Sequence, residues 1–366
     1  MAIVNRRMKV MHIISGDLWA GAEVQAYTLL KELRTDCDLH VILMNPGELA
    51  DRLKVLAIPV TLLDESKMNP VKILLDMRKT MLSFRPDIIH THRQKENILG
   101  AIANLLSVRA KSVRTSHGAP EFTAKGVRRL QPLLDQFIGN YLQHGIISVS
   151  EDLTKKLSRI FSSDKIYTIM NGVDIEALRA HICKADFCSN EPDKIHIGII
   201  GRLEPVKRID IFLRMAALLT VQASGRMMQF HVIGDGSQRN ALEKVGDELG
   251  LEDKVIFHGH RTDIPACISS LNVVVMCSDH EGTPMTALET LALGVPLVAH
   301  NVGGLKHILR RYPEWQVDDH TPQGYAKVIT LINEGLLREI ELEECYLAHH
   351  NADKIFDLYK LVLEKK

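Results

Sequence analysis

The sequence lacks the features that would assign the chain to several specialised classes of protein. Its six cysteines form no Cys-x-x-Cys pair, which disfavours both a disulfide scaffold and a zinc ribbon. No apolar run approaches the roughly 20 residues that a membrane-spanning helix needs, and there is no low-complexity segment or fixed-period repeat. No signal peptide is recognisable, so we expect a reduced, cytoplasmic chain. His181, Cys183 and Cys188 have a faint metal-site spacing, but scattered thiols are the favoured interpretation.

The chain also lacks a net charge, although its charges are unevenly distributed. Residues 1–170 carry 24 basic and 17 acidic side chains, and residues 171–366 carry 21 and 28, so the halves are +7 and −7. Two interpretations stay open. The basic half attracts the acidic half or an anionic membrane surface, or the charges are solvated and scattered by chance.

Apolar segments of strand and helix length alternate along the chain, which predicts two doubly wound α/β domains with parallel sheets. We expect domains over residues 1–170 and 195–345, an interdomain segment over 171–194, and a helical tail over 346–366 that crosses back to the first domain or stands apart. Such sheets bind ligands at the carboxyl ends of their strands, so we expect a site in a cleft between the domains. The predicted strands span 9–15, 39–44, 60–63, 86–90, 111–116, 145–150, 165–170, 195–200, 229–233, 254–258, 273–276 and 296–299.

Two glutamates, Glu281 and Glu289, mark the most informative stretch of the chain. The first follows a buried strand over 273–276, and the second lies in an apolar helix for which we expect Thr283 as N-cap and Pro284 as first residue. Free amides at such a helix start form an anion site. Neighbouring carboxylates would accept hydrogen bonds from sugar hydroxyls. The spacing of the two glutamates alone fits two interpretations equally well. One is this ligand site, and the other is an ordinary capped helix in which Glu281 is solvated and Glu289 forms an ion pair.

The stretch resembles a known signature. Glu281-Gly-Thr-Pro-x4-Glu289, followed by Ala292-x-Gly294-x-Pro296, is similar to the Glu-x7-Glu motif of retaining, nucleotide-sugar-dependent glycosyltransferases with the GT-B fold. This is the family of glycosyl transferases group 1, or family 4. Other pieces stand in the family's order along nearly the whole chain. The resemblance implies two Rossmann-like domains and a role in lipopolysaccharide, exopolysaccharide or glycolipid synthesis.

The resemblance implies a set of donor-binding residues. Arg202 and Lys207, in a Gly-Arg-Leu…Lys segment, would stabilise the leaving diphosphate. The family usually has glycine after this lysine, whereas this chain has Arg208, which puts the geometry of the loop in doubt. The diphosphate would also meet the amide of Gly21, where the family's second glycine is replaced by Ala20. The turn after the second domain's signature strand would contribute through Gly282, Thr283, Pro284 and Met285.

Other matched positions would contact the rest of the donor or the reacting centre. Glu289 would bind the ribose, and Gly234 and Arg261 would lie near the nucleoside. Glu281 would bind donor-sugar hydroxyls. His117, in a Ser-His-Gly segment, would lie near the reacting centre. His90 and His92 follow another strand and are weaker candidates for acceptor contact, and Asn171-Gly172-Val173-Asp174 has a structural interpretation.

The resemblance implies a metal-independent transferase without a cofactor, whose donor is a UDP- or GDP-linked sugar and whose acceptor is a saccharide or a lipid-linked saccharide. Glu281 and His117 would support the transition state without acting as nucleophile. No nucleic-acid partner is implied. A sugar-nucleotide epimerase of the same architecture and a catalytically silent nucleotide-sugar-binding protein are the alternatives. Peripheral association with the inner face of a membrane, through Lys125, Arg128 and Arg129, is a further hypothesis.

Overall fold

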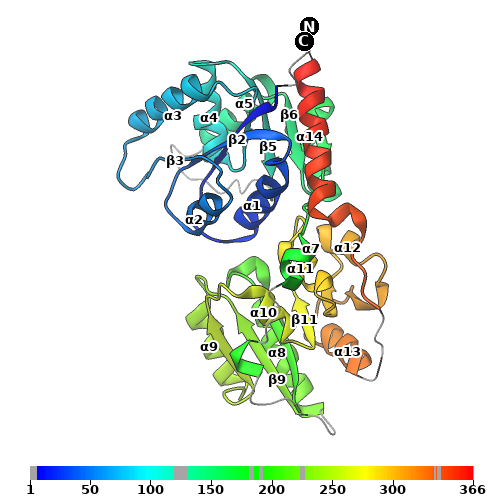
Figure 1. Cartoon of the computed structure of the whole chain (residues 1–366). Coiled ribbons are helices and arrows are strands. Elements are labelled where there is room, and N and C mark those ends of the chain that lie inside the picture. Colours follow the sequence, from blue (N-terminus) through cyan, green and yellow to red (C-terminus); the bar gives the residue numbers. More distant parts are fainter. Residues whose placement is uncertain are drawn as a thin grey trace. The chain divides into compact units, whose positions relative to one another are not determined.

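The computed structural model describes residues 6–118, 130–180, 185–188, 193–222, 227–333, 335 and 339–365. The chain divides into two compact units: unit 1 comprises 1–172 and 345–366, and unit 2 comprises 173–344. Each contains one parallel sheet with helices around it (Figure 1), so the predicted pair of doubly wound domains is confirmed. Residues 173–194, expected in an interdomain segment, are part of unit 2, and the tail from Cys345 is part of unit 1. Among the described residues, no helix is long and apolar enough to cross a membrane.

The sheet of unit 1 has seven strands in the order β3-β2-β1-β4-β5-β6-β7, and each neighbouring pair is parallel. The order reverses between β1 and β4, which makes their carboxyl ends a topological switch point, where ligands bind in open α/β sheets. The strands are β1 Met8–Ile14, β2 Cys37–Leu43, β3 Val60–Leu62, β4 Ile88–Thr91, β5 Lys111–Ser116, β6 Gly145–Ser148 and β7 Ile166–Thr168.

Two apolar cores lie on the opposite faces of this sheet because successive strand side chains alternate. Val10 and Ile14 of β1 enter the core built with α1, α2 and α14, whereas Met11 and Ile13 enter the core built with α3 and α4. The C-terminal helix α14 packs beside α1 (Figure 1). The helices are α1 Gly21–Leu33, α2 Glu48–Val55, α3 Pro70–Phe84, α4 Gln94–Leu105, α5 Leu130–Tyr141, α6 Glu151–Leu157 and α14 Ala348–Glu364.

Unit 2 has a six-stranded parallel sheet in the order β10-β9-β8-β11-β12-β13, and its switch point lies between β8 and β11. Strand β11 coincides with the predicted range. The strands are β8 Ile195–Ile200, β9 Met228–Ile233, β10 Val255–Gly259, β11 Val273–Met276, β12 Leu297–His300 and β13 Gln316–Val317. The helices are α7 Ile175–Ala180, α8 Ile209–Gln222, α9 Arg239–Glu248, α10 Ile264–Ser269, α11 Met285–Ala292, α12 Gly303–Ile308 and α13 Pro322–Asn333, with short 3-10 turns η3 Asp186–Cys188 and η4 Pro205–Lys207.

Candidate functional site

Lys207 and Glu281 form an ion pair at the switch point of unit 2, although 74 residues separate them in the chain. Lys207 Nζ lies 2.5 Å from Glu281 Oε1, and Ser278 Oγ donates a 2.7 Å hydrogen bond to the same oxygen. Glu281 is buried and the Lys207 side chain is 21% exposed. Among the described residues both contacts end on Oε1, which leaves Oε2 for a ligand. Arg202, the other predicted cation, is exposed just after β8.

Arg208 occupies the position where the resembling family has glycine, and it adopts the conformation that glycine favours. Its φ of 51° and ψ of 47° lie in the left-handed region, which costs an L-residue about 1–2 kcal/mol. Its guanidinium is held by Asp210 at 3.0 Å and Asp279 at 3.2 Å, and these hydrogen bonds raise the pKa of Arg208. The loop after Lys207 therefore keeps a glycine-like backbone without a glycine.

The backbone of the turn between β11 and α11 lies directly against the backbone of Gly303 and Gly304, with no room for a side chain between them. A Cβ on Gly303 would lie 2.1 Å from the Glu281 carbonyl oxygen, and one on Gly304 would lie 1.6 Å from that of Gly282. The Gly304 amide also donates to the Glu281 carbonyl at 3.1 Å. The adjacent glycines of α12 thus hold Glu281 in place. The sequence pattern did not single them out, although a Gly-Gly pair that begins four residues after the end of a predicted strand is a usable signal of close backbone approach.

Helix α11 begins at Met285, with Pro284 as the N-cap residue in an extended conformation and no side-chain capping hydrogen bond. The expectation of Thr283 as N-cap and Pro284 as first helical residue is therefore wrong by one position. Pro284 has a ψ of 128°, so it stands before the helix and not in its first turn. No N-cap side chain accepts a hydrogen bond from the first amides of α11. These amides are therefore available to bind an anion.

Glu289 lies in the second turn of α11 and is 8% exposed. Burial raises the pKa of its carboxyl to about 7, because the charged form loses its hydration. None of the described residues forms a hydrogen bond or ion pair with this carboxylate. It is a buried acceptor group with unused capacity.

The loops after β8 and β9 touch through their backbones. Gly234 has a φ of 138°, and a Cβ there would lie 1.9 Å from the Gly201 carbonyl oxygen. Its amide donates to the Gly259 carbonyl at 2.8 Å, which aligns the end of β9 with that of β10. Arg261, predicted near the nucleoside, forms ion pairs with Asp263 at 2.6 Å and Asp186 at 3.1 Å.

In unit 1, Gly21 is the first residue of α1, and its N-cap residue Ala20 provides no side-chain cap. Gly21 is exposed, so the amides at this helix start are accessible. Two residues later the carboxylate of Glu23 is fully buried and pairs with Arg93 Nη2 at 2.5 Å. Burial raises the pKa of Glu23 to about 7, with Arg93 opposing the shift.

The structure brings His90, His92 and His117 together with a fourth histidine, His12, which sequence analysis missed. His12 and His90 are paired residues of the neighbouring strands β1 and β4. His12 Nδ1 lies 3.0 Å from His92 Nε2, and His92 Nδ1 lies 3.3 Å from His117 Nε2. Burial lowers the pKa of His12 to about 3 and that of His117 to about 4. These imidazoles are therefore neutral at pH 7.

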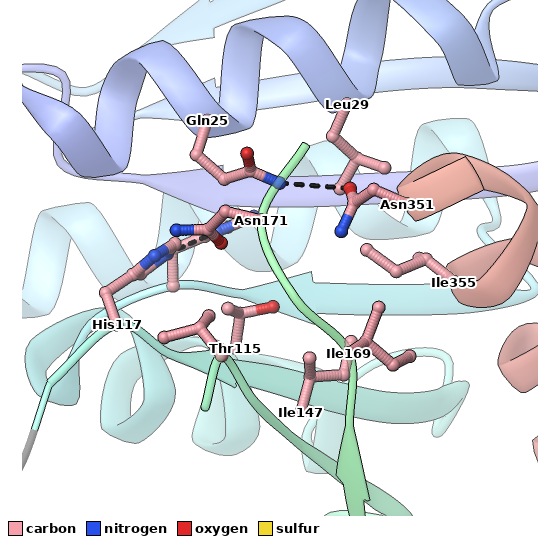
Figure 2. A pocket seen from close by; sticks show the side chains of 11 residues that line it. Gln25, Leu29, Thr115, His117, Ile147, Ile169, Asn171, Asn351 and Ile355 are labelled. Atoms are coloured by element: carbon pink, nitrogen blue, oxygen red, sulfur yellow. Dashed lines mark hydrogen bonds between the residues drawn. The ribbon is translucent and has the colours of Figure 1, made fainter. Parts of the chain in front are cut away.

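A small cavity of about 10 Å³ lies beside His117, roughly the space that one water molecule requires. Figure 2 shows Gln25, Thr115, His117, Asn171 and Asn351 among the side chains on its wall. Gln25 Nε2 donates to Asn351 Oδ1 at 3.0 Å, and Gln25 Oε1 accepts from the Gly172 amide at 3.2 Å.

Gly172 itself has no room for a side chain. A Cβ there would lie 2.7 Å from the Leu347 carbonyl oxygen, and Asp174 Oδ1 accepts from the Ala177 amide of α7. These contacts support the structural interpretation of the segment 171–174. Lys125, Arg128, Arg129, His181 and Cys183, named in earlier hypotheses, lie outside the described residues.

Two family models together match most of the chain. The model described as "Glycosyl transferases group 1" matches residues 185–339, and "Glycosyltransferase Family 4" matches residues 19–177. The chain is 25% identical over 382 residues to the UDP-Gal:alpha-D-GlcNAc-diphosphoundecaprenol alpha-1,3-galactosyltransferase of Escherichia coli, and the alignment covers 98% of each. It is also 25% identical to the capsular polysaccharide biosynthesis glycosyltransferase CapM of Staphylococcus aureus, over 84% of this chain and 83% of that protein.

Solved structures show the same fold at lower sequence identity. Sucrose-phosphate synthase of Thermosynechococcus elongatus has a TM-score of 0.81 at 16% identity, covering 98% of this chain and 100% of that one. HepE of Anabaena, in complex with UDP and glucose, has a TM-score of 0.77 at 20% identity, covering 98% of both chains. These likenesses confirm the predicted GT-B fold.

Proposed function

The chain belongs to the glycosyl transferases group 1 family, and on this premise we propose that it is a retaining, metal-independent hexosyltransferase whose donor is a nucleotide diphosphate sugar. The observation that carries the proposal is the ion pair of Lys207 with the buried Glu281, located at the switch point of unit 2 and next to the uncapped start of α11. A cation, a set of free amides and a carboxylate with one unused oxygen match the phosphates and hydroxyls of such a donor.

In this proposal the diphosphate is bound by Lys207, Arg202 and the amides of the turn 282–285, and in unit 1 by the amide of Gly21. Negative charge grows on the leaving phosphate as the glycosidic bond breaks, so fixed cations and amide dipoles lower the barrier. Lys207 then exchanges part of its contact with Glu281 for the phosphate. Glu281 Oε2 accepts hydrogen bonds from donor-sugar hydroxyls and orients the sugar.

Glu289 is assigned to the ribose in the same proposal. Its carboxylate is buried and has no partner among the described residues, and two adjacent hydroxyls would supply the hydrogen bonds that burial removed. The Escherichia coli relative is named for a UDP-linked donor and a lipid-diphosphate acceptor, which supports a UDP-linked sugar and a lipid-linked acceptor in polysaccharide or glycolipid synthesis. A GDP-linked donor is the second possibility. Because the Arg261 guanidinium is held by two aspartates, we assign any nucleoside contact there to the backbone.

The retaining step is proposed as a displacement on one face of the sugar. The acceptor hydroxyl oxygen forms a bond to the anomeric carbon while the bond from that carbon to the phosphate oxygen breaks. The hydroxyl proton passes to the leaving phosphate oxygen. Glu281 and His117 stabilise the charge and geometry of this step and form no covalent bond.

Metal independence is part of the proposal because cations and helix amides take the place of a metal ion. The single Asp-x-Asp triplet of the sequence, Asp36-Cys37-Asp38, stands at the start of β2, the edge opposite the carboxyl ends of the strands. Activity should therefore persist in excess EDTA. Loss of activity in EDTA with rescue by Mn²⁺ or Mg²⁺ would contradict this part of the proposal.

The decisive experiment offers UDP- and GDP-sugars to the full chain with a bacterial lipid extract as acceptor, and determines the product and its anomeric configuration. Glu281→Gln should lower kcat by about 10² or more, whereas Glu252→Gln, an exposed glutamate of the turn before β10, should leave kcat unchanged. Sugar turnover without an acceptor would favour the epimerase. Donor binding without any turnover would favour the silent binding protein.

We also propose peripheral contact of unit 1 with an anionic membrane, motivated by the +7 balance of residues 1–170. Such attraction is worth up to about 1 kcal/mol per basic residue near the surface and falls as salt screens it. Co-sedimentation with phosphatidylserine vesicles tests it. Charge reversal of Lys125, Arg128 and Arg129 should weaken binding at low salt, and unchanged binding would remove this proposal alone.

A further inference from the structure

Six side chains of unit 1 form one continuous chain of hydrogen bonds. Starting from β5, Thr115 Oγ1 lies 2.7 Å from His90 Nε2, and His90 Nδ1 lies 2.6 Å from the hydroxyl oxygen of Tyr359 in α14. That hydroxyl lies 3.4 Å from His12 Nε2. The chain continues from His12 Nδ1 to His92 Nε2, and from His92 Nδ1 to His117 Nε2. Every imidazole nitrogen except Nδ1 of His117 takes part in one link.

All six members are electrically neutral, which limits the arrangements of their hydrogen atoms. His12 and His90 are fully buried, as is Tyr359, and burial keeps the pKa of each of the four histidines below its usual value. A neutral imidazole has one N–H, and each hydroxyl has one O–H. Six hydrogens therefore serve five links, and every link can be filled in three arrangements: all donors point toward His117, all point toward Thr115, or both sides donate to the Tyr359 hydroxyl oxygen. The third leaves the hydrogen of the fully buried Tyr359 without an acceptor among the described residues, which is costly, so two arrangements remain, in which all donors point the same way.

The two arrangements differ at the ends of the chain. If the donors point toward His117, Thr115 donates to His90, and His117 carries its hydrogen on Nδ1. If they point away, His117 Nδ1 presents a lone pair and the buried Thr115 hydroxyl needs another acceptor. Thr115 Oγ1 has no second protein partner among the described residues, and the cavity that it lines with His117 has room for only about one water molecule, which needs several partners of its own. The second arrangement therefore depends on that single confined water as acceptor, or leaves a buried donor unsatisfied at a cost. The first arrangement leaves its unlinked N–H on the half-buried His117, where a ligand can accept it.

From this count we propose that the hydrogen-bond chain holds His117 as its Nδ1–H tautomer and makes that nitrogen a hydrogen-bond donor at the site. His92, His12, Tyr359 and Thr115 are then positioning residues that act through His117. The acceptor of the N–H is an oxygen of the bound donor or of the acceptor sugar, and this part rests on the proposed function. The C-terminal helix thereby sets the chemistry of a residue at the end of β5.

A metal ion is the competing explanation for three of these histidines. The closest ligand atoms of His12, His90 and His92 all lie within 4.8 Å of one another. Each of their nitrogens, however, already has a hydrogen-bond partner, and the rings of His90 and His92 are stacked at 13° with centroids 4.5 Å apart. The lone pairs of an imidazole lie in the plane of its ring, so the nearly parallel, stacked rings of His90 and His92 do not direct theirs at one ion, which favours the hydrogen-bond chain.

The test is the tautomer of His117 in the ligand-free full chain, measured by NMR of ¹⁵N-histidine protein through the couplings of ring protons to each nitrogen. His117→Gln identifies the signal. We expect protonation at Nδ1 in the wild type and in Thr115→Ser, and a mixture of tautomers in Thr115→Val and Tyr359→Phe. Tyr167 is not a member of the hydrogen-bond chain, because its hydroxyl contacts Lys365. Tyr167→Phe should therefore give the same His117 tautomer as the wild type. Protonation of wild-type His117 at Nε2, or a tautomer unaffected by both Thr115→Val and Tyr359→Phe, would overturn the proposal.

A kinetic measurement separates this proposal from the proposed function. Tyr359→Phe and Thr115→Val should lower kcat by about 2- to 10-fold, the range of one neutral hydrogen bond, and Thr115→Ser should restore it. The NMR measurement needs no substrate. If the protein proves to have no transferase activity, the assignment of the His117 tautomer therefore still holds. Unchanged kcat in variants whose tautomer has shifted would remove the contact between His117 and the substrate.

Discussion

The two units position their candidate residues at equivalent places and with opposite chemistry. In unit 1 the switch point between β1 and β4 carries buried histidines that are neutral at pH 7. In unit 2 the switch point between β8 and β11 carries Lys207 and Glu281, with Arg208 and Asp279 beside them. One sheet topology thus supports an uncharged hydrogen-bond network in one unit and a charge cluster in the other. The topology selects the location, and the side chains select what is bound there.

The physical consequence is a division of tasks. Charges attract phosphate and stabilise its negative charge, whereas neutral hydrogen bonds orient a group with little effect on its charge. Buried neutral histidines make unit 1 sensitive to acid, and among the described residues unit 2 has fewer histidines whose pKa is lowered by burial: His231, His258 and His320. Buried carboxylates with a raised pKa, Glu23 in unit 1 and Glu289 in unit 2, make both units sensitive to alkali, but Glu23 has Arg93 as a partner whereas Glu289 has none among the described residues. The comparison therefore predicts different responses of the two units to pH and to mutation.

Acid should destabilise unit 1 strongly. His12, His90, His92 and His117 have lower pKa values folded than unfolded. Their stabilising contribution is complete above about pH 6.5, and each loses up to about 1.4 kcal/mol per pH unit below it, because the unfolded state takes up protons first. Each unit contains one of the two tryptophans, Trp19 in unit 1 and Trp315 in unit 2. The fluorescence of Trp19 in the variant Trp315→Phe therefore follows the unfolding of unit 1, and that of Trp315 in the variant Trp19→Phe follows the unfolding of unit 2. Urea unfolding at pH 7.5 and 5.5 should show the larger loss for Trp19, and equal losses would contradict the comparison.

The next effect concerns the charge cluster of unit 2. Lys207→Ala and Arg202→Ala should each weaken UDP binding by about 1.5–3 kcal/mol, the scale of charge-assisted hydrogen bonds. Lys207→Ala should also lower stability, because the buried Glu281 loses its partner, whereas Arg202→Ala should not, because Arg202 is exposed. Lys244→Ala, an exposed lysine of α9, is the control. Calorimetry that finds full UDP affinity in the double variant would move the diphosphate elsewhere.

Glu289→Gln should have a pH-dependent effect of about 1–3 kcal/mol on stability. The pKa of Glu289 is about 7 when folded, compared with 4.5 as its ordinary value. The wild type therefore loses stability as the pH rises from about 4.5 to 7, and the variant should not. Thermal unfolding should find the variant more stable at pH 8 and similar at pH 4.5, while its UDP affinity falls. A variant less stable at pH 8 would mean that the carboxylate has a stabilising partner.

The smallest effect tests the left-handed Arg208. Arg208→Gly relieves the backbone strain but loses the contacts with Asp210 and Asp279, so its unfolding free energy should stay within about 0.5 kcal/mol of the wild type. Arg208→Ala keeps the strain without the contacts and should be about 1 kcal/mol less stable. Urea unfolding compares the two. An alanine variant as stable as the glycine variant would show that the strain is negligible.

Several features of this comparison were predictable from local patterns. The run Val273–Met276 is apolar and bounded by turn residues, so β11 was predicted at its observed limits. The alternation of strands and helices predicted both sheets. The helix start was misplaced by one residue because the Thr-Pro pattern favours proline in the first helical position, whereas Pro284 has an extended ψ of 128° and stands before the helix. The backbone conformation that separates the two positions is not encoded in the local residues alone.

The members of the histidine chain were not predictable as a set. His12 and Tyr359 are 347 residues apart, and Tyr359 has the spacing of an ordinary core residue on an amphipathic helix. Only the packing of α14 beside α1 brings its hydroxyl between two histidines. The same holds for Gly303 and Gly304, whose role depends on a turn formed more than 20 residues earlier.

The alternating strands and helices, the two sheets and the residue types at the end of β11 follow from the local sequence, because periodicity and turn chemistry act over a few neighbouring residues. Which of these groups meet depends on how the chain packs in three dimensions. This packing pairs Lys207 with Glu281, leaves Glu289 buried with no partner among the described residues, and links His117 to Tyr359. Burial and distance between residues far apart in the chain set the charge and the hydrogen-bond partners of each group, and both arise only when the sheets and helices pack.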